Sequence, residues 1–182
     1  MYPCYRDKVA LERRETFPAS WILLENLLHL STWVVAGMLL WPVRWLGWPV
    51  ATVAWAALVV AVQILLKKHN CSGCYYYGKS CHLGWGRLSA RMLAQDSGDP
   101  RTGTRLALFY ILSPPLFLVS GILVGVLLDA GVWHWATLGS YVLLNLVSFP
   151  VRMKGCRQCA MRHVCPGSAA KTGAGSVGAM VQ

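Results

Sequence analysis

Four long apolar stretches constrain the fold of this chain more than any other feature of its sequence. They cover residues 21–41, 47–66, 106–128 and 132–151. A helix crosses the hydrocarbon core of a bilayer with about 20 apolar residues, and a spanning segment must satisfy its own backbone polar groups. Charged residues make up only 13% of the chain, which is low for a soluble protein. We therefore expect an all-α integral membrane protein with four transmembrane helices.

The basic residues predict the orientation of these helices. Of the 17 Lys and Arg residues, all except Arg44 lie before the first stretch, between the second and third, or after the fourth. Because cytoplasmic loops are enriched in Lys and Arg, we expect both termini and the central loop on the cytoplasmic side of the cytoplasmic (inner) membrane. The net charge of +10 then reflects this orientation. We accordingly expect the lipid bilayer as a partner and no nucleic acid.

A shift of 85 residues aligns the first half of the chain with the second. It places the first apolar stretch on the third and the second on the fourth, and it pairs Cys71 with Cys156 and Cys74 with Cys159. Each unit contains an even number of spans, so the two copies keep the same orientation, as in parallel repeats. The sequence thus predicts two tandem helical hairpins, each followed by a short cysteine-rich loop.

The repeat divides the chain into five segments. A cytoplasmic N-terminal segment (1–20) precedes the first repeat (21–82), and a connector (83–105) leads to the second repeat (106–166). The connector has the pattern of a short amphipathic helix. The tail (167–182) is rich in Gly, Ala and Ser, and we expect it to be disordered.

The two loops that end the repeats carry the strongest chemical signal. Their sequences are KKHNCSGCYYYGKSCH and MKGCRQCAMRHVCPG, so each contains a C-x-x-C pair and a third cysteine. A C-x-x-C turn directs two thiolates at one metal centre, and thiols in the cytosol stay reduced. We predict that these loops bind a metal or cofactor, and the candidate ligands are Cys71, Cys74, Cys81, Cys156, Cys159 and Cys165.

An iron–sulfur cluster, of the 4Fe-4S type, is the leading interpretation of the six cysteines. Such a cluster takes four cysteines, and a cysteine followed by proline, as at Cys165, also occurs in bacterial ferredoxin loops. One cluster would use the two C-x-x-C pairs. Cys81 and Cys165 would then complete that cluster or a second one.

Other thiol chemistries fit the same spacing. One or two zinc ions are the first alternative, with His69, His82 and His163 available as further ligands. Dithiol exchange with a partner protein is the second. Handling of a soft metal such as Cu(I) is the third, although the spans contain no cysteine that would continue a path for it.

Two ionisable residues in the first apolar stretch form a second candidate site. Glu25 and His29 are four residues apart and therefore share a helix face. Ionisable groups inside a membrane are costly and often functional. One interpretation is a site for proton transfer or for a quinone headgroup, and the other is an interfacial position or a packing contact. In the third stretch, Pro114 and Pro115 predict a kink.

The sequence contains none of the common nucleotide-binding or hydrolase motifs, such as G-x-x-x-x-G-K-[ST], H-E-x-x-H or G-x-S-x-G. The leading hypothesis is a membrane-embedded iron–sulfur protein that relays electrons between a cytosolic or membrane redox partner and the membrane, with quinone as a candidate acceptor. The alternatives are a zinc-stabilised membrane anchor for a soluble partner, and soft-metal handling or membrane dithiol exchange.

Overall fold

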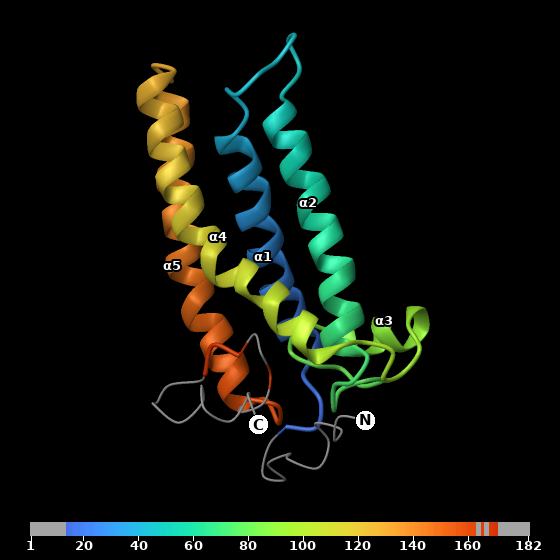
Figure 1. The fold of residues 1–182 in the computed structure, drawn as a ribbon. Coiled ribbons are helices and arrows are strands. Elements are labelled where there is room, and N and C mark those ends of the chain that lie inside the picture. The colour runs from blue at the N-terminus through green and yellow to red at the C-terminus, as the bar shows by residue number, and fades with distance from the viewer. Residues whose placement is uncertain (1–13, 163–164, 166–167, 171–182) are drawn as a thin grey trace.

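A computed structural model describes residues 14–162, 165 and 168–170. These residues form five α-helices and no strand, which confirms the all-α prediction. The α-helices are α1 (Ala19–Leu39), α2 (Val50–Leu66), α3 (Trp85–Met92), α4 (Pro100–Leu127) and α5 (Val132–Gln158), and a short π-helix, η2 (Lys67–Cys71), continues α2 (Figure 1). Most of the N-terminal segment and of the tail predicted from the sequence lie outside the described residues.

Three of these helical segments are long and apolar enough to cross a membrane. They are Ala19–Leu39, Val50–Cys71 and Pro100–Leu127. Large apolar side chains cover their outer faces, and Leu23, Val60 and Leu127 are 61%, 58% and 76% exposed. Outward-facing apolar side chains of this kind are expected where lipid surrounds the helices. The composition of the three helices indicates a membrane protein. The fourth apolar stretch of the sequence lies within α5.

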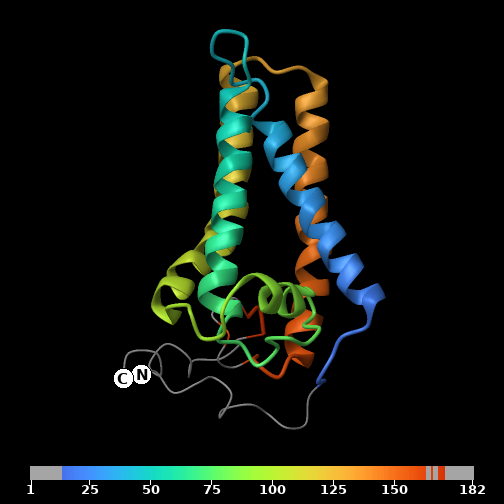
Figure 2. The ribbon, with the colours of Figure 1, turned by 90° about the vertical axis from the view of Figure 1, so that its right-hand side faces the viewer.

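α1 and α4 each pack against the other long helices of the bundle: α1 contacts α2, α4 and α5, and α4 contacts α1, α2 and α5. Figure 2 shows α1 and α2 close together at the end where a short loop joins them, and further apart at the other end. The first cysteine loop and α3 lie across this wider end. The core between the helices contains Ala36, Leu39, Trp55, Val59, Phe117, Leu138 and Tyr141.

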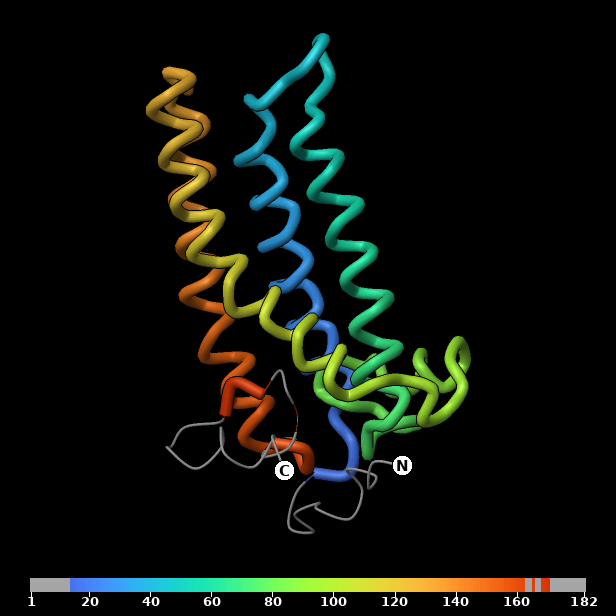
Figure 3. The backbone as a smooth tube through the Cα atoms, in the orientation of Figure 1, coloured from blue at the N-terminus to red at the C-terminus, as the bar shows by residue number. Residues whose placement is uncertain are grey.

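α4 begins with a well-formed cap and bends in its middle. The Asp99 carboxylate accepts hydrogen bonds from the backbone N–H groups of Arg101 (3.2 Å) and Thr102 (2.9 Å), which satisfies donors that have no partner within the helix. Figure 3 shows that α4 starts beside α3, runs past α1 and changes direction before it continues alongside α5. Pro114 and Pro115 lie inside this helix, and proline removes a backbone hydrogen bond there. The bend agrees with the predicted kink.

Gly86 in α3 lets this helix pack closely on the first cysteine loop. A Cβ atom at this position would overlap the backbone carbonyl oxygens of Tyr76 and Lys79. The Gly86 carbonyl also accepts a hydrogen bond from the N–H of Gly78 at 3.0 Å. These backbone carbonyl groups cannot rotate away from an added Cβ as a flexible side chain could.

We predict that Gly86→Ala destabilises the protein by about 1–3 kcal/mol, the usual cost of overpacking a close contact. Thermal unfolding in detergent would measure the change. Gly139→Ala in α5 is the matched control, because no atom lies within 4 Å of its added Cβ. An unfolding temperature of Gly86→Ala equal to that of Gly139→Ala would contradict the prediction.

Candidate functional site

The structure brings the two cysteine loops together at one end of the bundle. A hydrophobic cluster of Phe17, Tyr76, Cys159, Ala160 and Met161 lies there, and Cys74, Cys81 and Cys165 pack against it. The first loop follows η2, and the second follows the C-terminal end of α5. The six cysteines among the described residues are all free thiols, and Cys156 and Cys159 are buried. Residues far apart in the sequence therefore form one thiol-rich region.

Tyr76 connects the parts of this region. Its side chain is only 1% exposed. Its hydroxyl donates a hydrogen bond to the carbonyl oxygen of Arg14 at 2.6 Å and accepts one from the N–H of Ala160 at 3.1 Å. The segment before α1, the first loop and the second loop thus meet at one phenol group. Burial raises the pKa of this phenol well above its usual range, so the hydroxyl stays a neutral donor.

Four of the thiols form a set that spans both loops. Cys74 is close enough to Cys165, Cys71 and Cys81 for the charge of each thiolate to affect it. The buried ammonium group of Lys67 is similarly close to Cys71, Cys81 and Cys165. Thiols of the first loop therefore interact electrostatically with Cys165 of the second loop, and Cys165 in turn interacts with Cys159.

The second cysteine of each C-x-x-C pair has the same local environment. Burial raises the pKa of Cys74, and the backbone N–H of Tyr76 opposes this rise. Burial also raises the pKa of Cys159, to about 12, and the backbone N–H of Met161 opposes it. In both loops the N–H belongs to the residue two positions after the cysteine. N–H groups in this arrangement stabilise thiolates, including those that bind metals.

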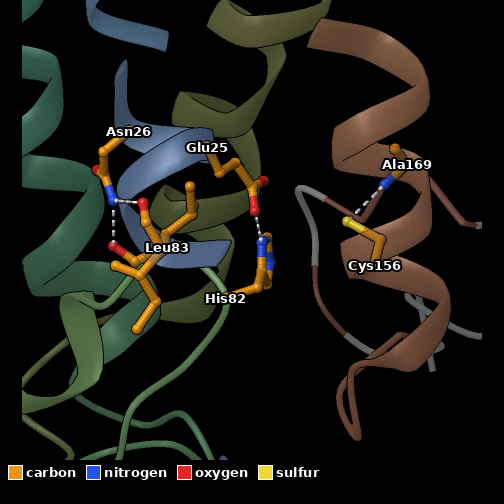
Figure 4. A network of polar contacts seen from close by, with 7 residues as sticks. Glu25, Asn26, His82, Leu83, Cys156 and Ala169 are labelled. Atoms are coloured by element: carbon orange, nitrogen blue, oxygen red, sulfur yellow. Dashed lines mark hydrogen bonds and ion pairs between the residues drawn. The ribbon is translucent and has the colours of Figure 1, made fainter. Parts of the chain in front are cut away.

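Cys156 interacts with a largely buried histidine, His82. Nδ1 of His82 is 2.8 Å from Oε2 of Glu25, and the N–H of Ala169 donates to Sγ of Cys156 at 3.4 Å (Figure 4). Burial would raise the pKa of the Cys156 thiol, but its interaction with His82 outweighs burial and the pKa is lowered. Burial would lower the pKa of His82, yet Cys156 and Glu25 raise it to about 10. Both interactions therefore favour the protonated form of the His82 ring.

The other predicted residues have different surroundings. Nδ1 of His69 accepts a hydrogen bond from the N–H of Asp99 at 2.9 Å, which fixes the start of α4. The ring of His29 is stacked on the ring of Tyr110, with centroids 5.3 Å apart, and is tilted against the ring of Trp33 at 4.2 Å. His163 lies outside the described residues. Glu25 and His29 share a helix face as predicted, but the hydrogen-bonding partner of Glu25 is His82.

The described residues contain no group of three His, Cys, Asp or Glu side chains arranged to hold a single metal ion. Comparisons of the chain with protein-family models, with curated proteins and with solved structures gave no match. Any function proposed for this chain therefore rests on its own residues and contacts.

We predict that Tyr76→Phe destabilises the cysteine end of the bundle. The change leaves the buried N–H of Ala160 and the carbonyl of Arg14 without this hydroxyl, at a cost of about 1–3 kcal/mol. Limited proteolysis and thermal unfolding would detect the loss. Tyr75→Phe is the matched control, because its hydroxyl makes no hydrogen bond with the described residues and its ring contacts with Tyr76 and Lys79 remain. Equal stability of the two variants would argue against a structural role for the Tyr76 hydroxyl.

Proposed function

We propose that this chain is a membrane-embedded iron–sulfur protein that passes electrons between a redox partner protein and a carrier in the membrane. The observation that carries the proposal is the meeting of thiols from two distant loops in one buried region. We assign Cys71, Cys74, Cys81 and Cys165 as the cluster ligands. This assignment differs from the sequence hypothesis, in which the two C-x-x-C pairs were the ligands. Cys156 interacts with His82 instead, and Cys159 is buried in the hydrophobic cluster beside Tyr76.

The spacing required by a cluster differs from that of a single ion. Thiolates that share one zinc ion lie about 3.8 Å apart, given a tetrahedral Zn–S distance of about 2.3 Å. A 4Fe-4S cluster places each thiolate on a different iron atom, so its ligands are more widely separated. Among the described residues no three such side chains are arranged to hold a single ion, so the proposal requires the wider spacing of a cluster.

The surroundings of the four thiols suit a negatively charged centre. Buried thiolates are costly unless positive charge or N–H donors compensate them. Lys67 is buried beside three of the thiols, and its ammonium group lies 4.5 Å from the centroid of the Trp85 ring. When bound, the cluster would supply one-electron chemistry, and these residues would hold it, neutralise it and exclude water.

Four spans in two tandem hairpins remain part of the proposal. The shift of 85 residues moves α1 onto the interior of α4, and it moves α2 with η2 onto the interior of α5. The packing follows the same relation. When each helix is exchanged with its counterpart in the other repeat, α1 with α4 and α2 with α5, the pair α1–α5 becomes the pair α4–α2. Both pairs are in contact. These correspondences support a repeat in which residues 132–151 form the fourth span.

We predict that anaerobically purified protein contains iron and acid-labile sulfide, each at about four per chain, with a broad visible absorbance that dithionite bleaches. Cys74→Ala should lose most of the iron, because Cys74 interacts electrostatically with the three other assigned ligands. Cys156→Ala is the matched control and should keep its iron. Metal analysis and the visible spectrum of both variants provide the measurement.

Each other outcome of the metal analysis overturns the proposal in a defined way. A colourless protein with one or two zinc ions would leave a zinc-stabilised anchor for a soluble partner. A protein without metal would favour dithiol exchange. Loss of iron from Cys156→Ala with retention in Cys74→Ala would contradict the ligand assignment alone.

We also predict that the cysteine end of the bundle faces the cytoplasm. Leu46, in the loop between α1 and α2, is 83% exposed, and Ser97, before α4 at the cysteine end, is also exposed. In intact cells, a membrane-impermeant maleimide should label Leu46→Cys and should label Ser97→Cys only after permeabilisation, each measured against the parent protein. The reverse pattern would place the cysteine loops outside.

A further inference from the structure

A cavity of about 370 Å³ lies inside the bundle between α1, α4 and α5. This volume is within the range of about 300–1,000 Å³ found for small-molecule sites. Its wall reaches Phe117 in the hydrophobic core and Ala169 at the cysteine end. Because the N–H of Ala169 donates to Sγ of Cys156, the cavity and the thiol-rich region share part of a wall.

Flat aromatic surfaces line much of the cavity. Trp33, Tyr110 and His29 face it from α1 and α4, and Trp55 and Tyr141 add further rings. The rings of His29 and Tyr110 are stacked at 5.3 Å with an angle of 21° between their planes. Aromatic rings in the wall of a cavity favour a planar ligand, since stacking on them adds to the apolar area that is buried.

Two polar atoms on the cavity residues have no hydrogen-bond partner among the described residues. They are Oε1 of Glu25 and Oγ of Ser148. Glu25 is only 5% exposed, and its other carboxylate oxygen, Oε2, is bonded to His82 (Figure 4). Buried polar atoms are nearly always paired in native proteins. A ligand with a hydroxyl group that donates to Oε1 of Glu25, and with a second oxygen atom within reach of Oγ of Ser148, would pair both of them.

We propose that this cavity binds the ring of a lipophilic quinone. A quinone is planar and uncharged, and it carries two oxygen atoms on an otherwise apolar ring. The Ser148 hydroxyl can donate to a ring carbonyl, and Oε1 of Glu25 can accept from a hydroxyl of the reduced quinol. The wall of the cavity carries a cationic side chain, Arg152, as well as the carboxyl group of Glu25, and an uncharged ring suits such a mixed wall.

The role of the bound quinone rests on the proposed function. The conversion of one quinone to one quinol takes two electrons and two protons. Two successive one-electron transfers from the cysteine-bound centre would supply the electrons, a reduced soluble electron carrier would restore that centre after each transfer, and water would supply the protons.

Binding is tested on the purified full-length chain in detergent with a benzoquinone that carries a saturated alkyl tail. We expect saturable quenching of tryptophan fluorescence, because Trp33 and Trp55 line the cavity. Ser148→Phe should fill the cavity and weaken binding by about tenfold or more, a change that the ratio of dissociation constants reports. Ser140→Phe is the matched control, since Ser140 is exposed on the same helix and does not line the cavity.

Glu25→Gln tests the polar contact separately. It should reduce the preference of the protein for quinol over quinone, since a carboxylate accepts more readily than an amide from the quinol hydroxyl. A purely structural role for Glu25 would change both dissociation constants by the same factor. An azido-quinone that labels α1 or α4 beside the cavity would support the site without any variant.

The outcomes separate this inference from the proposed function. Absence of saturable quinone binding to the parent protein, or photolabelling only on the outer face of the helices, would overturn the cavity assignment even if iron is present. Equal binding by Ser148→Phe and Ser140→Phe, with both folded, would do the same. Quinone binding that requires the cavity in a chain without iron would support the site and overturn the electron-transfer proposal.

Discussion

The buried pair of Glu25 and His82 is the contact on which the arrangement of the cysteine end depends. The two residues are 57 positions apart, and their side chains are only 6% and 13% exposed. Beside them, the side-chain amide of Asn26 donates to the carbonyl of Leu83 at 3.0 Å. Two neighbouring residues of α1 thus hold two neighbouring residues of the first cysteine loop. Removing one member would leave the other polar group without its partner in a largely buried position, so this pair helps to hold the loop against α1.

The helices were predictable because their signal is local. An apolar stretch that cannot satisfy its backbone groups by other means becomes a helix, and the predicted boundaries of the first stretch, 21–41, differ from α1 by only two residues. The third apolar stretch, 106–128, differs more from its helix, since α4 begins at Pro100. There the Asp99 cap and Pro100 start the helix in a polar segment, and hydropathy alone does not register such a start.

The site was only partly predictable, because its partners are distant in the sequence. Spacing within each loop identified the cysteines as a chemical unit, and the repeat suggested that the two loops share one end. Helical periodicity paired Glu25 with His29. In the folded chain, however, the hydrogen-bonding partner of Glu25 is His82, which belongs to the first cysteine loop. Likewise, nothing in the local pattern separates Cys156 from the other thiols. Cys156 differs because it interacts with His82, and only the folded chain brings His82 next to it.

The bend in α4 explains how a cavity and a thiol-rich region come to share a wall. A straight helix that packed on α5 along its whole length would leave the cysteine end of α1 uncovered. Because α4 changes direction near Pro114, its first half crosses towards η2 and carries Tyr110 to His29, whereas its second half stays with α5. The helices therefore diverge at the level of Glu25, and the space between them is lined by Pro114, Tyr110 and Glu25. The bend at Pro114 and Pro115 therefore helps to open the cavity that lies next to the cysteine end of the bundle.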